Sequence, residues 1–203
     1  MTEKPTALLL DRPLLVSRLN SGDAVIIPTD TLPGLAVIPE RAERIWALKR
    51  RPADKPLILM GATVESLFEH VACDCREEAI VAAALCWPGP VTLVLPARDK
   101  AMVRHLNPGG TTLGCRIPCC LQTQELLAES GPLATSSANR SGAPAARTAE
   151  EAAREFPNVP QLGPQPWLPS SGQASTVLAW QDSGVWQLLR RGAVMPEGLR
   201  IRE

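Results

Sequence analysis

This chain alternates helix-like and strand-like segments along most of its length, and that alternation constrains its fold more than any other feature of the sequence. Helices are predicted over 11–20, 41–50, 63–71, 77–86, 122–129 and 148–155, and strands over 23–27, 56–60, 91–95, 112–117, 132–135, 175–180 and 185–189. Proline separates many of these segments. It occurs 20 times in 203 residues, which is about twice its usual frequency of ~5%. The pattern predicts an α/β fold.

Polar segments follow two of the predicted strands. The strand 23–27 is followed by a Thr-Asp-Thr segment at 29–31, and the strand 132–135 is followed by a Ser-Ser-Ala-Asn segment at 136–139. Ligands commonly bind beyond the carboxyl ends of strands in open α/β sheets. The same residue types also form ordinary turns for local reasons. Taken alone, each segment therefore fits a ligand site or a turn.

A third unusual segment is the basic cluster at 49–55, which holds four cations in seven residues. At about 100° per residue, Lys49 falls on the same apolar stripe as Ile45 and Trp46, whereas Arg50 points away from it. An inward-facing lysine needs anionic or polar partners, and a polyphosphate would suit it. The alternative is a solvated helix end whose cations favour the helix dipole.

Charge and cysteine usage narrow the classes of protein that fit. Lys and Arg together number 21, as do Asp and Glu, so the chain carries no broad positive field for nucleic acid or anionic membrane. The 6 cysteines accompany no export-like segment, which favours reduced thiols and a cytoplasmic protein. The spacing of the cysteines is unlike that of zinc ligands, and we expect no resident protein-bound metal.

The domain organisation is predicted to be simple. We expect a single domain over 1–203 with a core at about 11–194, and no stretch approaches the ~18 apolar residues of a membrane span. Residues 157–172 hold five prolines and little periodicity, so they are predicted to form a loop or a lid.

Seven short motifs resemble one family in the same order and spacing, the YrdC (TsaC) family. They are 28–34 (PTDTLPG), 49–57 (KRRPADKPL), 87–92 (WPGPVT), 116–118 (RIP), 135–142 (TSSANRSG), 175–177 (STV) and 190–192 (RRG). The resemblance is to the short form of the family, without an additional C-terminal domain. It implies a mixed, twisted open sheet flanked by helices, with a concave basic cavity lined by strand ends.

The same resemblance implies an enzyme, an L-threonylcarbamoyladenylate synthase of the nucleotidyltransferase class. Such an enzyme condenses L-threonine, bicarbonate and ATP, with Mg²⁺ accompanying the ATP, and its product feeds tRNA threonylcarbamoyl transferase machinery. Weak or no direct nucleic-acid binding is implied. Two alternatives remain, an RNA-binding module and a paralogue that acts on another small anion or carbamoyl group.

The resemblance also implies roles for particular residues of this chain. Lys49 and Arg51 would be catalytic cations that screen the repulsion between the two anionic substrates. The residues implied to contact threonine are Thr29, Thr31, Arg116, Ser137 and Ser175. The residues implied to contact ATP are Arg51, Lys55, Thr112, Asn139, Arg147 and Arg190. Two positions depart from the family pattern. Pro33 stands where many members carry an aromatic ring, and Met60 stands where some members carry a histidine.

Overall fold

The computed structural model describes residues 8–52 and 55–203. Its helices are α1 Arg12–Asn20, α2 Glu43–Lys49, α3 Val64–Phe68, α4 Arg76–Cys86, α5 Lys100–Leu106, α6 Leu121–Ser130 and α7 Ala149–Glu155. Its strands are β1 Leu9–Leu10, β2 Val25–Ile27, β3 Gly34–Val37, β4 Ile58–Met60, β5 Val91–Pro96, β6 Thr112–Arg116, β7 Leu133–Ser137, β8 Gln161–Leu162, β9 Thr176–Trp180, β10 Val185–Arg190 and β11 Arg200–Arg202. Short 3₁₀ turns occupy Pro39–Arg41, Cys73–Cys75 and Asp182–Gly184.

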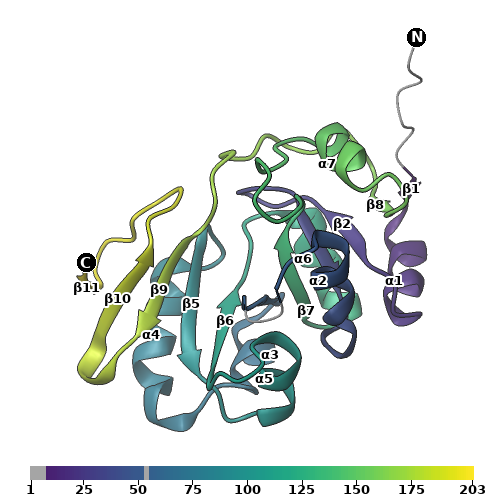
Figure 1. Cartoon of the computed structure of the whole chain (residues 1–203). Coiled ribbons are helices and arrows are strands. Elements are labelled where there is room, and N and C mark those ends of the chain that lie inside the picture. The colour runs from purple at the N-terminus through teal and green to yellow at the C-terminus, as the bar shows by residue number, and fades with distance from the viewer. Residues whose placement is uncertain (1–7, 53–54) are drawn as a thin grey trace.

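The strands form one mixed, twisted open sheet in the order β1-β8-β2-β3-β7-β4-β6-β5-β9-β10-β11 (Figure 1). Parallel pairs such as β4 with β6 and β5 with β9 alternate with antiparallel pairs such as β5 with β6 and β3 with β7. The first and last strands of the chain therefore lie at opposite edges of the sheet. This arrangement confirms the predicted fold class.

Helices pack on both faces of the sheet, because successive side chains in each strand point to opposite faces. One buried cluster joins Ile26 of β2 to side chains of α2, α3, α4 and α5, and a second joins Val25 and Ile27 to α1 and α6. Figure 1 shows α4 beside β5 and β9, and α1 beside β2. Within the two described ranges, no helix combines the length and apolar character needed to cross a bilayer.

Local sequence signals explain the best-predicted helices. Asp11 caps α1 by accepting a hydrogen bond from the backbone nitrogen of Leu14 at 3.0 Å, and Thr63 caps α3 in the same way through Ser66 at 3.2 Å. Thr148 caps α7 through the backbone nitrogen of Glu151 at 3.2 Å. All seven predicted strands are also present, with bounds that shift by one or two residues.

Some elements differ from the sequence prediction. The predicted helix 41–50 is divided into a 3₁₀ turn at Pro39–Arg41 and the helix α2, which ends where Arg50 adopts a left-handed φ of 49°. The predicted loop 157–172 contains the strand β8, which pairs with both β1 and β2. The strands β1, β3 and β11 and the helix α5 are not among the elements predicted from the sequence.

Candidate functional site

A cavity of about 390 Å³ lies over the face of the sheet formed by β4, β5, β6 and β9. Its lining residues are Thr29, Thr31, Leu32, Gly34, Arg51, Pro56, Leu57, Ile58, Met60, Thr92, Val94, Asn107, Thr112, Gly114, Arg116, Thr135, Ser136, Ser137, Ala174, Ser175, Val177, Leu189 and Arg190. Three of these residues are arginines and eight carry hydroxyl groups. The cavity therefore offers donors suited to anionic ligands.

The register of the strands determines which residues form the floor of the cavity. Gly114 of β6 stands opposite Ile58 of β4 and opposite Val94 of β5, so the three positions share one face of the sheet. A Cβ atom at Gly114 would lie 3.4 Å from the Thr92 side chain and 3.8 Å from that of Ile58. Because Gly114 has no side chain, nothing projects from this residue into the middle of the cavity.

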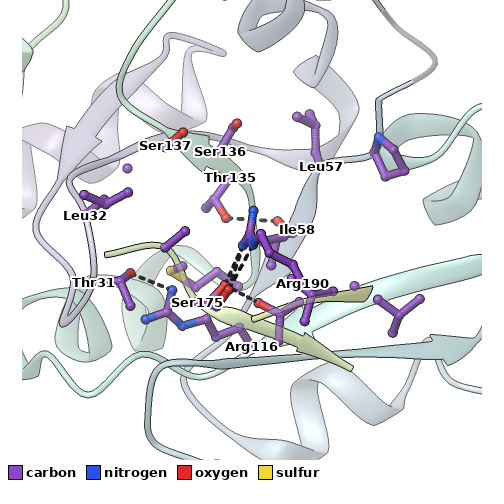
Figure 2. A pocket seen from close by; sticks show the side chains of 18 of the residues that line it. Thr31, Leu32, Leu57, Ile58, Arg116, Thr135, Ser136, Ser137, Ser175 and Arg190 are labelled. Atoms are coloured by element: carbon purple, nitrogen blue, oxygen red, sulfur yellow. Dashed lines mark hydrogen bonds between the residues drawn. The ribbon is translucent and has the colours of Figure 1, made fainter. Parts of the chain in front are cut away.

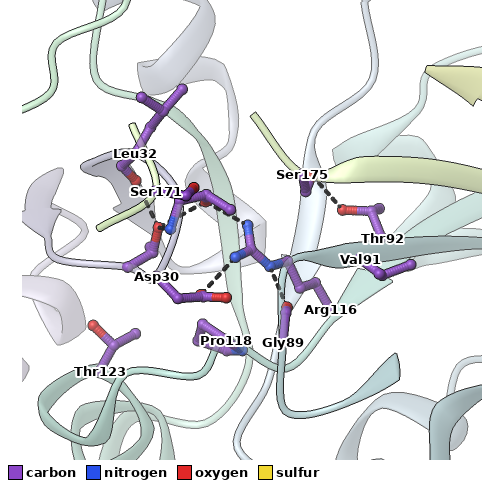
Figure 3. A network of polar contacts seen from close by, with 12 residues as sticks. Asp30, Leu32, Gly89, Val91, Thr92, Arg116, Pro118, Thr123, Ser171 and Ser175 are labelled. Atoms are coloured by element: carbon purple, nitrogen blue, oxygen red, sulfur yellow. Dashed lines mark hydrogen bonds and ion pairs between the residues drawn. The ribbon is translucent and has the colours of Figure 1, made fainter. Parts of the chain in front are cut away.

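Arg116 is the most heavily buried cation of the cavity, with 3% of its surface exposed. Its Nε donates to the Gly89 carbonyl at 3.0 Å, its Nη1 to Thr31 Oγ1 at 2.9 Å and its Nη2 to Asp30 Oδ1 at 2.6 Å (Figure 3). Burial lowers the pKa of Arg116, and the charge of Asp30 opposes that shift. These three contacts come from two segments, one with Asp30 and Thr31 and the other with Gly89, and they fix the guanidinium in one orientation.

The two threonines beside Arg116 form a directed chain of hydrogen bonds. The hydroxyl of Thr29 donates to the Leu32 carbonyl at 2.7 Å, so the 2.9 Å contact between the two hydroxyls must be a donation from Thr31 to Thr29. Thr31 in turn accepts from Arg116. Both threonines are buried, and the Thr31 hydroxyl retains one lone pair that can face a ligand.

Ser175, which directly precedes β9, and Arg190, the last residue of β10, lie next to this group (Figure 2). Arg190 donates to the Ser175 carbonyl at 3.1 Å through Nε and at 2.9 Å through Nη2, and Nη2 also lies 3.1 Å from Ser175 Oγ. The Ser175 hydroxyl is 2.9 Å from that of Thr92. Arg190 is thereby oriented by the same serine that lines the cavity.

Lys49 faces inward, as its position on the apolar stripe predicts, and only 2% of its surface is exposed. Its Nζ donates to the carbonyls of Ser137 and Asn139, both at 2.5 Å, and lies 3.4 Å from Asn139 Oδ1. Burial and the nearby charge of Arg51 lower the pKa of Lys49 to about 8. Lys49 is not among the residues that line the cavity. Its closest partners are backbone oxygens of the Ser-Ser-Ala-Asn segment.

The predicted site residues fall into two groups. The structure brings together in one cavity Thr29, Thr31, Arg51, Thr112, Arg116, Ser137, Ser175 and Arg190. Lys49 and Asn139 lie behind the cavity wall and bond each other. Lys55, the last residue of the basic cluster 49–55, is exposed. Ala53 and Asp54 of the same cluster lie outside the described residues. Arg147 lines a second cavity of about 230 Å³ that also contains Thr29, Pro33 and Trp167.

Several residues of the site were not predicted from the sequence. Asp30 belongs to the polar segment 29–31 but has no predicted role of its own, and it is the ionic partner of Arg116. Thr92, Asn107 and Gly114 reach the cavity because strand register and a helix end place them there. Met60 is a cavity residue with 3% of its surface exposed. Alternation along the strands 91–95 and 112–117 would have identified Thr92 and Gly114.

The fold and the site together define a mixed-sheet α/β protein with a cavity over one face of the sheet that is lined by arginine and hydroxyl side chains. A family comparison is more specific, because the profile of the Sua5/YciO/YrdC family, described as "Telomere recombination", matches residues 17–192. The chain belongs to this family. The resemblance seen in its sequence motifs is thus confirmed.

Relatives of known name agree with this assignment. The chain is similar to proteins named threonylcarbamoyl-AMP synthase from Pyrococcus abyssi, with 38% identity over 68% of this chain and 41% of the relative, and from Bacillus subtilis, with 33% identity over 88% and 52%. The corresponding protein of Klebsiella pneumoniae is 34% identical over 70% of this chain and 76% of its own length. The chain thus spans about half the length of the first two relatives.

Solved structures show the same fold. P. abyssi Sua5 complexed with L-threonine matches with a TM-score of 0.82 and 30% identity, over 94% of this chain and 58% of that one. E. coli YciO matches with a TM-score of 0.72 and 21% identity, over 92% of both chains. The second likeness concerns the fold alone.

Proposed function

We propose that this chain is a threonylcarbamoyl-AMP synthase, which joins L-threonine, bicarbonate and ATP into L-threonylcarbamoyladenylate and pyrophosphate. The observation that carries the proposal is the buried Arg116 fork, which shares one cavity with Arg51 and Arg190. Relatives that bear this name, and a solved relative complexed with L-threonine, support it. In chemical terms the protein is a nucleotidyltransferase.

Arg116 and the two threonines would bind the amino-acid substrate. A guanidinium has five N–H donors, and three contacts from Arg116 to the protein leave donors for a substrate carboxylate. Thr31 offers an acceptor, and Thr29 holds Thr31 in place. Ser137 and Ser175 supply hydroxyl groups on two further sides of the same cavity.

The reaction needs two negatively charged groups to meet. The amino group of threonine and bicarbonate give a carbamate and water, and a carbamate oxygen then attacks the α-phosphorus of ATP. The new P–O bond replaces the bond between the α-phosphorus and the oxygen that bridges to the β-phosphate, and pyrophosphate leaves with that electron pair. Fixed cations lower the repulsion in this step, and no protein nucleophile is required.

Arg51 and Arg190 line the cavity and would be the cations that face the phosphates. Arg51 is held through Nη2 by the Pro56 carbonyl at 3.1 Å and approaches Ser136 Oγ at 3.4 Å through Nη1. Thr112 would contact the nucleoside, while Lys55, Asn139 and Arg147 would act from outside the described lining. We assign Lys49 the task of holding the backbone of Ser137 and Asn139.

Mg²⁺ is proposed to enter with ATP. The described lining of the cavity contains hydroxyl oxygens and guanidinium groups but no carboxylate, so it does not form a protein cage for a divalent cation. Mg²⁺ commonly keeps several waters and binds mainly through substrate phosphates. When bound, the ion neutralises charge on the leaving pyrophosphate.

The product is proposed to pass to tRNA threonylcarbamoyl transferase machinery in the cytoplasm, where ATP and tRNA meet. The chain itself would bind nucleic acid weakly or not at all, because its formal net charge is +0.

The test is an assay with labelled L-threonine, bicarbonate, ATP and Mg²⁺, in which the adenylate and pyrophosphate are measured together. We expect both products in equal amounts, and neither when bicarbonate is removed. Pyrophosphate without the adenylate would contradict the proposal. Salt-dependent RNA binding without consumption of ATP would favour the alternative, an RNA-binding module.

A further inference from the structure

The cavity has two chemically different ends. Arg116 and Thr112 are the last and first residues of β6, so at ~3.3 Å per residue their Cα atoms are about 13 Å apart. Figure 2 shows Leu57 and Ile58 across the cavity from Thr31. Towards the Thr112 end the lining is apolar, with Pro56 and Leu57 at that end and with Ile58 and Val94 at the level of Gly114. A charged carboxylate suits the Arg116 end, whereas a flat heteroaromatic ring suits the Thr112 end.

Asn107 is the only carboxamide among the described lining residues, and it lies at this apolar end. It directly follows Leu106, whose carbonyl accepts a hydrogen bond from the backbone nitrogen of Leu57 at 2.8 Å. Its Nδ2 donates to the Thr112 carbonyl at 2.9 Å and lies 3.4 Å from Thr112 Oγ1. Helix α5 and strand β6 thus fix the position of the carboxamide.

The contact with Thr112 also settles which way the carboxamide is turned. A carbonyl oxygen only accepts hydrogen bonds, so the nitrogen of Asn107 has to face Thr112 and Oδ1 has to face away. In the part of the chain described here, no group donates a hydrogen bond to Asn107 Oδ1. The apolar end of the cavity is therefore provided with one oriented acceptor.

We propose that Asn107 Oδ1 accepts a hydrogen bond from the 6-amino group of adenine and so selects ATP among purine nucleotides. This inference rests on the proposed function, since that function places a nucleotide in the cavity. Gly114 leaves the floor between Ile58 and Val94 without a side chain, which lets a planar base lie close to the sheet. A 6-oxo purine would instead set its oxygen against Oδ1, and the two acceptors would repel each other.

The experiment compares how tightly three nucleotides bind, by calorimetry with Mg²⁺ present. ATP carries the 6-amino group, purine riboside triphosphate lacks it, and ITP carries a 6-oxo group. For the unmodified protein we expect ATP to bind about tenfold more tightly than purine riboside triphosphate, the effect of one hydrogen bond, and ITP to bind more weakly still.

Two substitutions distinguish recognition of the base by Asn107 from structural support of the loop that contains Asn107. Asn107→Ala removes the acceptor, so ATP and purine riboside triphosphate should bind equally. Asn107→Asp keeps an acceptor and removes the donor to Thr112, so the preference for ATP should remain. Asn20→Ala, at an exposed residue that ends α1, is the matched control and should change nothing.

The outcomes distinguish the inference from the proposed function. If Asn107→Ala weakens all three nucleotides by the same factor, the side chain only supports the loop and the inference is wrong. The inference is equally wrong if the unmodified protein makes the adenylate but binds ATP and purine riboside triphosphate alike, although the proposed function would then stand. Absence of both ATP binding and adenylate formation would refute the proposed function and the inference together.

Discussion

At the scale of single residues, the site depends on how a few polar side chains are oriented by their neighbours. Arg116 is anchored by Asp30, Thr31 and the Gly89 carbonyl, partners that come from two segments far from Arg116 and from each other in the sequence. The sequence could indicate that a guanidinium suits a carboxylate ligand. It could not reveal that Asp30 is the charge that offsets burial of Arg116, because that pairing depends on tertiary contact.

We expect Arg116→Lys to raise the KM for threonine at least tenfold while the KM for ATP stays nearly unchanged. A lysine cannot form the fork that binds a carboxylate through two parallel hydrogen bonds, and it cannot keep contacts with both Asp30 and Thr31. Steady-state kinetics with each substrate varied in turn would measure this. Arg191→Lys, at an exposed arginine, is the control and should match the unmodified protein. Equal rises in both KM values would show that Arg116 does not act on threonine.

Lys49 gives a prediction about stability and pH. Its pKa is lowered to about 8 because burial disfavours the charged form, so the cost of burying that charge is fully present below pH 8. Between about pH 8 and the ordinary pKa of 10.5, the unfolded chain binds more protons at this residue than the folded chain. The free energy of unfolding contributed by Lys49 therefore rises with pH across that window.

Urea unfolding of the unmodified protein and of Lys49→Met at pH 7.5, 8.5 and 9.5 would test this. We expect the difference in free energy of unfolding to shift in favour of the unmodified protein as pH increases. A difference that is constant or moves the other way would show that Lys49 is not buried as a charged group.

At the scale of helices and strands, the sequence predicted elements that are defined by local signals and missed those defined by pairing. The caps at Asp11, Thr63 and Thr148 are visible in the sequence, and the helices they begin are present. Strands β3 and β8 were missed because local signals do not reveal their partners, which are β2 and β7 for β3 and β1 and β2 for β8. Only the register of such strands can show which side chains share the cavity floor.

Helix α5 was missed although it carries a clear cap. Asp99 accepts hydrogen bonds from the backbone nitrogens of Ala101 at 2.9 Å and Met102 at 3.0 Å, and it also contacts His70 Nδ1 at 2.9 Å. The helix has only 7 residues, too few for a clear apolar periodicity. Its last turn leads into Asn107, so this short helix helps to place the apolar end of the cavity.

We expect Asp99→Ala to lower the free energy of unfolding by about 1 kcal/mol, the usual cost of losing a helix N-cap. The bond from the Met102 backbone nitrogen is the main cause that lowers the pKa of Asp99. The contribution of Asp99 is therefore present above its ordinary pKa of about 3.9 and is lost as the pH falls below it.

Urea unfolding at pH 7 would measure the loss, with Glu197→Ala as a control at an exposed carboxylate. The cap would be ruled out as a stabilising contact if both variants unfolded at the same urea concentration as the unmodified protein. A loss that persisted unchanged at pH 2.5 would show that the carboxylate charge is not responsible.

At the scale of the whole molecule, the cavity is the place where segments from distant parts of the sequence meet. The predicted loop 157–172 is tied to the site at its end, because the backbone nitrogens of Ser171 and Gly172 donate to the carbonyls of Asp30 and Thr31 at 3.0 and 3.1 Å. The same loop exposes Leu168, of which 79% of the surface is accessible. Two backbone hydrogen bonds therefore join the end of the loop to the segment that carries Thr31.

We expect L-threonine and ATP together to slow cleavage of this loop by thermolysin at Leu168 at least threefold. A ligand that binds only the closed arrangement lowers the population that the protease can cut, by a factor that grows with ligand concentration over its Kd. Cleavage would be followed by mass spectrometry, first without ligand, then with each substrate alone and with both. Arg116→Lys provides the comparison that isolates the threonine contact, since in that variant protection by threonine should be lost while any protection by ATP remains. Cleavage at one rate under all four conditions would show that the loop is fixed independently of the site, and protection that survives in Arg116→Lys would place the coupling elsewhere than at Thr31.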